Sequence, residues 1–364
     1  MNSLTLAQLD VGRDNNFNLL RFVAASLVVL THAFGLTGHE STEPLLRSAG
    51  ISLGSLAVDI FFVVSGFLIT KSWIRRDDPV RFFFARFMRI YPALWISVCA
   101  CALVLGPLFT TLPLGDYFRH IGTFKFLVEN STLLISGTVD RLPVVFDALQ
   151  SHSINAPLWT LPYELKLYIG LAILGMAGSL RSRTTVVVLA LASFIGFCAA
   201  WLHLIEVSER ATDTLRFIYF FSSGAAFYLF GERVRIGWPF LAGLFAVALV
   251  SGYLLDSPHQ LRLLLGLLCP SLVMVAAFVP RGRIRLFNRV GDYSFGIYIF
   301  AMPIQQSIIA LTNNASVAAN SFASYTITLL LAILSWHFVE RKMVSYAIPE
   351  PLVRLGSMLR IRRS

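Results

Sequence analysis

Ten long apolar runs dominate the chain, and each is close to the roughly 20 residues that a helix needs to cross a bilayer. None alternates apolar and polar residues with a period of two, which argues against a transmembrane β-barrel. Charged residues make up 14 % of the 364 residues, whereas a soluble protein carries roughly 25 %. The sequence therefore predicts an all-α, polytopic helical bundle in a membrane, and excludes a soluble enzyme, a disordered protein and a nucleic-acid-binding domain. We expect helices near residues 17–36, 53–73, 90–109, 159–179, 185–203, 215–231, 237–255, 261–279, 292–312 and 322–340.

Lysine and arginine residues are concentrated on alternate connections between these runs. In membrane proteins such residues collect on the cytoplasmic side. The side that includes both ends of the chain holds 21 of the 30 cationic residues, six of them between residues 71 and 89. We therefore expect both termini in the cytoplasm, and the net charge of +10 then needs no nucleic-acid partner. Seven cationic residues are expected on the opposite side: Arg47, Arg119, Lys125, Arg141, Arg210, Arg216 and Arg262.

The remaining sequence features indicate neither a metal site nor a soluble domain. All four cysteines fall inside apolar stretches, where free thiols act as small apolar side chains, so we expect neither disulfides nor a metal site. The histidines outside the first helix show no metal-ligand spacing. A moderately polar connection, residues 110–158, is long enough to fold over one face of the bundle. No phosphate-binding glycine motif and no nucleophile motif of soluble hydrolases is present.

Two ionisable residues in the first predicted helix lie on one face. Arg21 and His32 are eleven residues apart, which is only about 20° beyond three full turns. Along the helix axis they are separated by about 16 Å. With the N-terminus inside, Arg21 lies towards the cytoplasm and His32 in the outer half. The alternative interpretation is a snorkelling arginine and a histidine at the interface, but ionisable groups inside a span usually mark function.

Two carboxylates are expected at the depth of His32. Asp59 lies about two turns into the second helix and Glu164 about one turn into the fourth, and both helices enter from outside. A carboxylate beside an imidazole fixes its tautomer and favours its protonated form. The alternative is a structural polar cluster that joins helices. Lys166 faces away from Glu164 and is expected to pair elsewhere or to snorkel.

An arginine pair is predicted at the cytoplasmic start of the third helix. Arg86 and Arg89 are three residues apart and can act on one side of that helix. Guanidinium forks match phosphate oxygens, so the pair suits a phosphorylated ligand from the cytoplasm; lipid headgroups are the alternative ligand. In the second helix, Ser65 and Gly66 are small enough for a close backbone approach.

These residues together resemble the acyltransferase-3 family of membrane acyltransferases, which modify extracytoplasmic glycans in bacteria. The resemblance runs from about residue 15 to residue 342. Its most specific part is an arginine and a histidine separated by ten residues, in NLLRFVAASLVVLTHAF. The other matching segments are VDIFFVVSGFLIT, RFMRIYPALW, LWTLPYELKLY, GDYSFGIYIFAMPI and SWHFVERK.

The resemblance implies a donor, an acceptor and a set of roles. The donor is cytoplasmic acyl-CoA, most often acetyl-CoA, and no cofactor is permanently bound. The acceptor is a sugar hydroxyl of a polysaccharide or lipid-linked oligosaccharide beyond the bacterial inner membrane. His32 would act as general base, oriented and charge-balanced by its polar neighbours, although an acyl-His32 intermediate stays open. The implied site residues are His32, Glu164, Asp59 and Arg21 for catalysis, Arg86, Arg89, Ser65 and Gly66 for acyl-CoA, and Trp159, Tyr163 and Tyr298 for the acceptor.

The chain departs from the family pattern at two positions. Ala301 stands where many relatives have histidine, which removes a second-histidine role, and Lys342 stands where many have proline. We expect residues 1–345 to form the acyltransferase domain and residues 346–364 a basic cytoplasmic tail, so that the membrane domain completes the transfer or hands the acyl group to a separate protein. Two other functions stay open. A secondary transporter or glycan flippase could use the intramembrane charges as a relay, and a non-catalytic scaffold would leave them unexplained.

Overall fold

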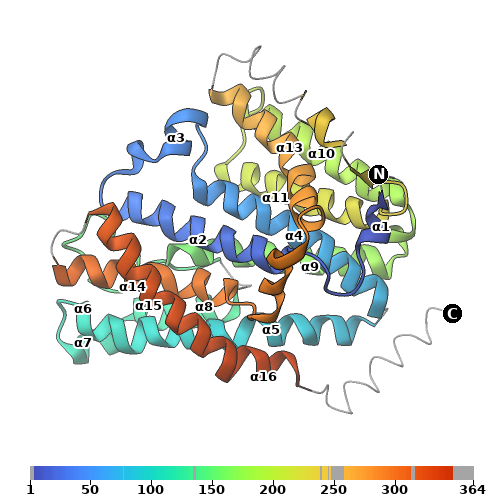
Figure 1. Cartoon of the computed structure of the whole chain (residues 1–364). Coiled ribbons are helices and arrows are strands. Elements are labelled where there is room, and N and C mark those ends of the chain that lie inside the picture. Colours follow the sequence, from blue (N-terminus) through green and yellow to red (C-terminus); the bar gives the residue numbers. More distant parts are fainter. Residues whose placement is uncertain are drawn as a thin grey trace. The chain divides into compact units, whose positions relative to one another are not determined.

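The computed structural model (Figure 1) describes residues 4–346 except 77, 134–136, 238–239, 245, 247–257 and 313–315. Apart from two short paired strands, β1 (Leu4–Thr5) and β2 (Arg235–Ile236), the regular structure is helical. The α-helices are α1 (Leu6–Leu9), α2 (Phe17–Leu36), α3 (Pro44–Ala49), α4 (Leu53–Arg76), α5 (Pro79–Ala100), α6 (Gly106–Phe109), α7 (Leu114–Arg119), α8 (Ile121–Thr132), α9 (Leu161–Met176), α10 (Arg183–Trp201), α11 (Glu209–Leu229), α13 (Pro258–Phe278), α14 (Ser294–Thr312), α15 (Val317–Ser335) and α16 (Arg341–Val344).

Seven helical segments within the described residues are long and apolar enough to cross a membrane. Two of them are extended by a π-helical turn, Cys101–Leu105 after α5 and Trp336–Glu340 after α15. The chain is therefore a polytopic helical membrane protein, as the apolar runs predict. The seven segments are Phe17–Leu36, Leu53–Arg76, Pro79–Phe109, Arg183–Trp201, Gln260–Phe278, Ser294–Thr312 and Val317–Val344.

Three of the ten predicted spans are not among these seven. α9 occupies the fourth but has only 16 residues, and α11 occupies the sixth with charged residues in its first two turns, among them Asp213 and Arg216. The seventh, residues 237–255, lies largely outside the described residues, as does the basic tail from residue 347 onward.

The chain divides into two compact units. The first comprises residues 1–24, 43–75 and 167–292, and the second comprises residues 25–42, 76–166 and 293–364. Helices α2 and α9 each contribute to both units.

In the first unit, α4 and α11 cross with their backbones in close approach (Figure 1). A Cβ atom added to Gly66 would lie 1.9 Å from the carbonyl oxygen of Phe221, and one added to Gly224 would lie 2.1 Å from that of Val63. Small residues allow this kind of helix packing in membranes. The close approach predicted at Gly66 is therefore confirmed, and its partner is the backbone of α11.

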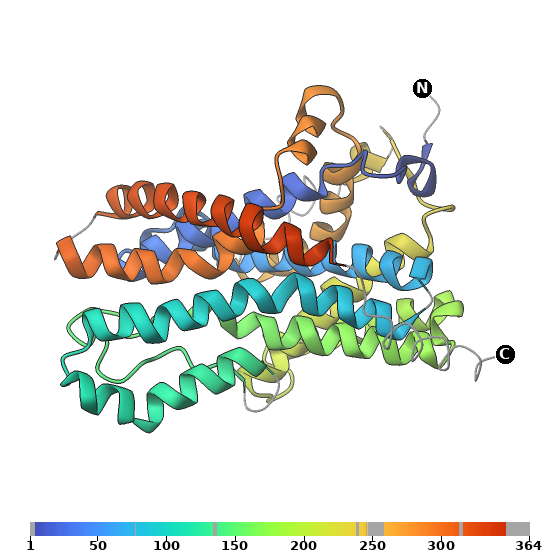
Figure 2. The same cartoon turned by 90° about the horizontal axis from the view of Figure 1, so that it is seen from below.

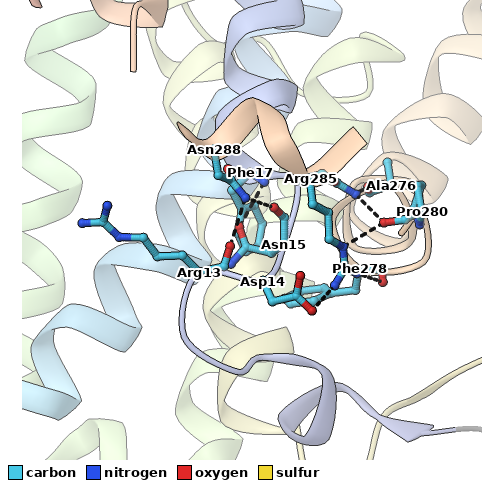
Figure 3. Close-up of polar contacts among 10 residues, drawn as sticks. Arg13, Asp14, Asn15, Phe17, Ala276, Phe278, Pro280, Arg285 and Asn288 are labelled. Carbon is cyan, nitrogen blue, oxygen red and sulfur yellow. Dashed lines mark hydrogen bonds and ion pairs between the residues drawn. The ribbon is translucent and has the colours of Figure 1, made fainter. Parts of the chain in front are cut away.

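The N-terminal segment of the first unit is fastened to the end of α13 (Figure 3). Arg285 forms an ion pair with Asp14. The same guanidinium donates to two carbonyls at the end of α13, those of Phe278 and Pro280. The amide of Asn288 donates to two carbonyls of the N-terminal segment, those of Arg13 and Asn15. These bonds satisfy the C-terminal carbonyls that a helix leaves without an internal partner, and they hold the start of α2 in place.

The second unit contains the antiparallel hairpin of α14 and α15, which run side by side (Figure 2). The connection of residues 110–158 belongs to this unit, and α8 within it packs against α5. Its far end is tied to α14 because the Asn155 amide donates to the Ile299 carbonyl over 2.9 Å. The Gln306 amide donates in turn to two carbonyls of the connection, those of Ser151 and Ser153.

The prediction of a long cationic loop between the second and third spans is wrong. α4 continues to Arg76 and α5 begins at Pro79, where the Asp78 carboxylate accepts from the Arg81 amide and caps the helix. Arg86 and Arg89 therefore lie inside α5 rather than ahead of it. The charges suggested a loop because the sequence does not reveal which acidic residues neutralise them. Lys71, for example, is buried in α4 and pairs with Asp10 over 2.5 Å.

Candidate active site

Arg21 and His32 lie on one continuous helix, α2, as predicted. Arg21, in the first unit, forms an ion pair with Asp292, just before α14. One turn earlier, the Asn18 amide donates to the Gly291 carbonyl over 2.8 Å. The start of α2 is thus held, through Asn18 and Arg21, by the first two residues of the GDYSFGIYIFAMPI segment.

His32 lies on the part of α2 that belongs to the second unit. Gln305 of α14 donates to the Val29 carbonyl over 2.8 Å, and the Ser26 hydroxyl lies 2.9 Å from that of Tyr325 on α15. The His32 ring itself is partly buried, and among the described residues it has no hydrogen-bond or ion-pair partner. The predicted contact with Glu164 is therefore not formed within this unit. These bonds to α14 and α15 hold the part of α2 that carries the imidazole in place.

Asp59 is paired in the first unit with an arginine for which the sequence predicts no partner. Arg216, on α11, is buried, and its Nε lies 2.7 Å from the Asp59 carboxylate. Its Nη2 donates to the Ser55 carbonyl over 2.8 Å, and its Nη1 lies 3.8 Å from Asp213. Arg216, predicted on the outer side at the start of the sixth helix, lies two turns inside α11, where its buried partner carboxylate makes the charge tolerable.

Glu164 lies on the first turn of α9, close to Tyr298 of α14 in the same unit. The Tyr298 hydroxyl lies 2.7 Å from the Thr160 hydroxyl and donates to the Pro157 carbonyl over 2.7 Å. Glu164 acts electrostatically on that phenol. Three predicted residues, Glu164, Tyr298 and Trp159, are therefore grouped around the turn Ala156–Thr160 that leads into α9.

Trp159 and Tyr163 are neighbours at the start of α9. Their ring centroids are 5.7 Å apart in an edge-to-face arrangement, and Trp159 is 39 % exposed. The Lys166 ammonium lies 5.7 Å from the centroid of the Tyr163 ring. Lys166 is exposed and separate from Glu164, in line with its predicted position. Tyr163 is partly buried, so Trp159 is the exposed ring of the pair.

Arg89 has a carboxylate partner in the second unit. Its Nη1 donates to Glu340 over 2.6 Å, and the Ser335 hydroxyl donates to the other Glu340 oxygen over 2.9 Å. The guanidinium also lies over two aromatic rings, those of Phe295 and Trp336. Glu340 ends the π-helical turn after α15, and such turns are frequent at functional sites. Arg86 lies one turn earlier on α5 and is partly buried.

Three site partners were missed at the level of sequence. Arg216 was predicted only as a charge of the outer side, whereas Asp292 and Glu340 lie in segments whose charged residues were given no role. The available signal was the presence of an acid within a matching segment, GDYSFGIYIFAMPI or SWHFVERK. No group of three or more metal-ligating side chains occurs in the part of the chain that the structure describes.

The fold defines a polytopic helical membrane protein with ion-paired charges on its membrane helices. The acyltransferase domain model of the acyltransferase-3 family matches residues 14–337. The chain therefore belongs to this family and is a membrane acyltransferase.

Two of the named relatives align along nearly the whole chain, and a third aligns along part of it. An O-acetyl transferase of Shigella phage Sf6 is 30 % identical over 349 residues, which cover 93 % of this chain and 98 % of the phage protein. Nodulation protein 10 of Rhizobium leguminosarum bv. viciae is 25 % identical, with 97 % and 96 % covered. The exopolysaccharide production protein ExoZ of Rhizobium meliloti is 31 % identical over 158 residues, covering 40 % of this chain and 46 % of ExoZ. No solved structure matches the chain.

Proposed function

We propose that this protein transfers an acyl group, acetyl in the simplest case, from cytoplasmic acyl-CoA to a sugar hydroxyl of an extracytoplasmic or lipid-linked glycan. The observation that carries the proposal is the continuous helix α2, which bears an ion-paired arginine and, about 16 Å away along its axis, a histidine without a partner among the described residues. Relatives named O-acetyl transferase and exopolysaccharide production protein support the acetyl group and the glycan acceptor.

In the proposed reaction, His32 takes the proton of the acceptor hydroxyl while the hydroxyl oxygen attacks the thioester carbonyl. The carbon–sulfur bond then breaks, the thiolate of CoA leaves and takes the proton from His32, and a sugar ester remains. General base catalysis of this kind contributes about 10²- to 10⁴-fold. Glu164 is the first candidate to orient the imidazole, and Asp59, which Arg216 already neutralises, is the second. Arg21 would hold in place the cytoplasmic end of α2, on the helix face that also carries His32.

The remaining predicted residues would bind the two substrates. Arg86 and Arg89 would bind the phosphates of CoA, and Ser65 would lie along the path of its pantetheine arm. Gly66, also predicted to bind acyl-CoA, packs against the backbone of α11 and would act by bringing the two helices together. For the acceptor, the exposed Trp159 and its neighbour Tyr163 would supply a stacking surface, and the buried Tyr298 would hold the turn that carries Trp159. Residues 1–345 would form this catalytic domain.

The proposed topology has ten spans in a bacterial inner membrane, with both termini in the cytoplasm. In addition to the seven segments above, α9, α11 and residues 237–255 would cross. We expect a cysteine in place of Ala318, at the outer start of α15, to react with an impermeant thiol reagent in intact spheroplasts. A cysteine in place of Arg283, between α13 and α14, should react only after lysis. Both positions are exposed, and the parent should carry Cys99→Ala because Cys99 is an exposed free thiol. The opposite labelling pattern would overturn the orientation.

Mass spectrometry of surface glycans tests the function directly. Cells that express the protein should carry an ester-linked acyl group, removable by mild base, that cells without it lack. In proteoliposomes, acyl-CoA consumption should match the acceptor acylated. Movement of glycan across the bilayer without acyl-CoA consumption would instead establish a flippase or transporter.

A further inference from the structure

Arg262, near the start of α13, lies flat against an aromatic ring in the first unit. Its guanidinium carbon is 3.6 Å from the centroid of Trp201, the last residue of α10. Stacking fixes the plane of the guanidinium and leaves its N–H edges, which lie in that plane, available for hydrogen bonds. The arginine is thus pre-oriented at low cost in side-chain entropy.

Within the described part of the chain, the Arg262 guanidinium has no hydrogen bond and no ion pair. This is unusual because Arg262 is partly buried and buried charged groups are normally paired. The nearest acids, Asp59 and Asp213, act on Arg262 electrostatically. Both are already engaged by Arg216, at 2.7 Å and 3.8 Å. Among the described residues, Arg262 therefore has donors without an acceptor, and the acids that act on it are already bonded to Arg216.

The charges of this cluster favour a particular ligand chemistry. The formal charges of its two arginines and two aspartates sum to zero, which favours a neutral ligand over a free anion. Asp213 is 29 % exposed and has acceptor capacity left after its long contact with Arg216. A donor fork fixed on an aromatic ring beside a partly exposed carboxylate suits adjacent hydroxyl groups, which both donate and accept hydrogen bonds.

We propose that Arg262 and Asp213, supported by Trp201, form a binding subsite for a neutral hexose unit of the acceptor glycan. The inference rests on the proposed function only in taking the bound sugar to be part of the acceptor glycan. In the proposed topology, the end of α10 and the starts of α11 and α13 all lie on the extracytoplasmic side, where such a glycan is found. Asp59 and Arg216 then position the subsite by joining α4 to α11.

Saturation-transfer NMR on the detergent-purified full chain tests the subsite without any acyl donor. The probes are the methyl glycosides of glucose, galactose, mannose and rhamnose, with methyl glucuronide as the anionic comparison. Arg262→Gln and Asp213→Asn should each weaken binding of the preferred neutral glycoside about tenfold, the effect of losing one charge-assisted hydrogen bond. Arg210→Gln is the matched control, since Arg210 is an exposed arginine on the first turn of α11, and it should bind like the parent.

The outcomes separate this subsite from the proposed function. If the parent binds a neutral glycoside through Arg262 but acylates no sugar, the function fails and the subsite stands. If the parent acylates surface glycans while Arg262→Gln and Asp213→Asn bind and acylate like Arg210→Gln, the subsite is wrong. Binding of the glucuronide alone, lost on Arg262→Gln, would overturn the neutral-hexose assignment in favour of an anion site.

Discussion

Replacement of His32 by alanine should abolish acyl transfer to the glycan while the protein still folds and reaches the membrane at the parental level. The loss of a general base costs about 10²-fold or more, and the ring makes no hydrogen bond within the described residues whose removal would destabilise α2. The measurement is the initial rate of CoA release with acceptor present, in membranes normalised for protein content.

A second histidine on the same part of the chain provides the matched control. His39 lies three residues beyond the end of α2, is exposed and contacts Thr37 through one ring nitrogen. His39→Ala should keep the parental rate. If His32→Ala retains more than about a tenth of the parental turnover, the general-base role is wrong, whatever the effect on acceptor affinity.

The sequence was sufficient to predict the features that depend on neighbours along the chain. The apolar runs located α2, α4, α14 and α15, and helical periodicity alone placed Arg21 and His32 on one helix. The small residues of the second run predicted the close approach that Gly66 makes. The helices and the shared face follow from the length of a span and from spacing within a single helix. These two properties can be read without knowing which helices are neighbours.

Ion-pair partners distant in sequence could not be predicted in the same way. Arg21 pairs with Asp292 and Arg216 with Asp59, and the residues of each pair are separated by 271 and 157 positions. A charged residue near the end of an apolar run looks like a loop residue until its partner is known, which is why Arg216 was placed outside and Arg86 and Arg89 before their helix. Buried pairing is what allows these charges to lie inside their helices.

Arg86 and Arg89 need different variants in a test of CoA binding, because Arg89 is paired with the buried Glu340 carboxylate. If Arg86 binds a CoA phosphate, Arg86→Gln removes charge-assisted hydrogen bonds worth about 1.5–3 kcal/mol. The affinity for CoA should therefore fall about 10- to 150-fold, at 1.4 kcal/mol for each factor of ten. Arg86→Lys should restore only part of it, because a point charge does not reproduce the fork. Isothermal titration of detergent-purified protein with CoA measures the change, and acceptor binding should be unaffected.

Arg89 needs a compensated variant, because Arg89→Gln alone leaves the buried Glu340 carboxylate without its partner at 2.6 Å. Breaking a buried pair in this way destabilises a protein by about 3–5 kcal/mol and would lower CoA binding through loss of fold. The double variant Arg89→Gln/Glu340→Gln removes both charges and keeps two side chains that can hydrogen-bond. If Arg89 binds phosphate, the double variant should bind CoA as weakly as Arg86→Gln. Arg81→Gln, an exposed arginine on the same helix, should bind like the parent. Parental affinity in the double variant would mean that Arg89 serves only to hold Glu340, and parental affinity in Arg86→Gln as well would remove the phosphate site from α5.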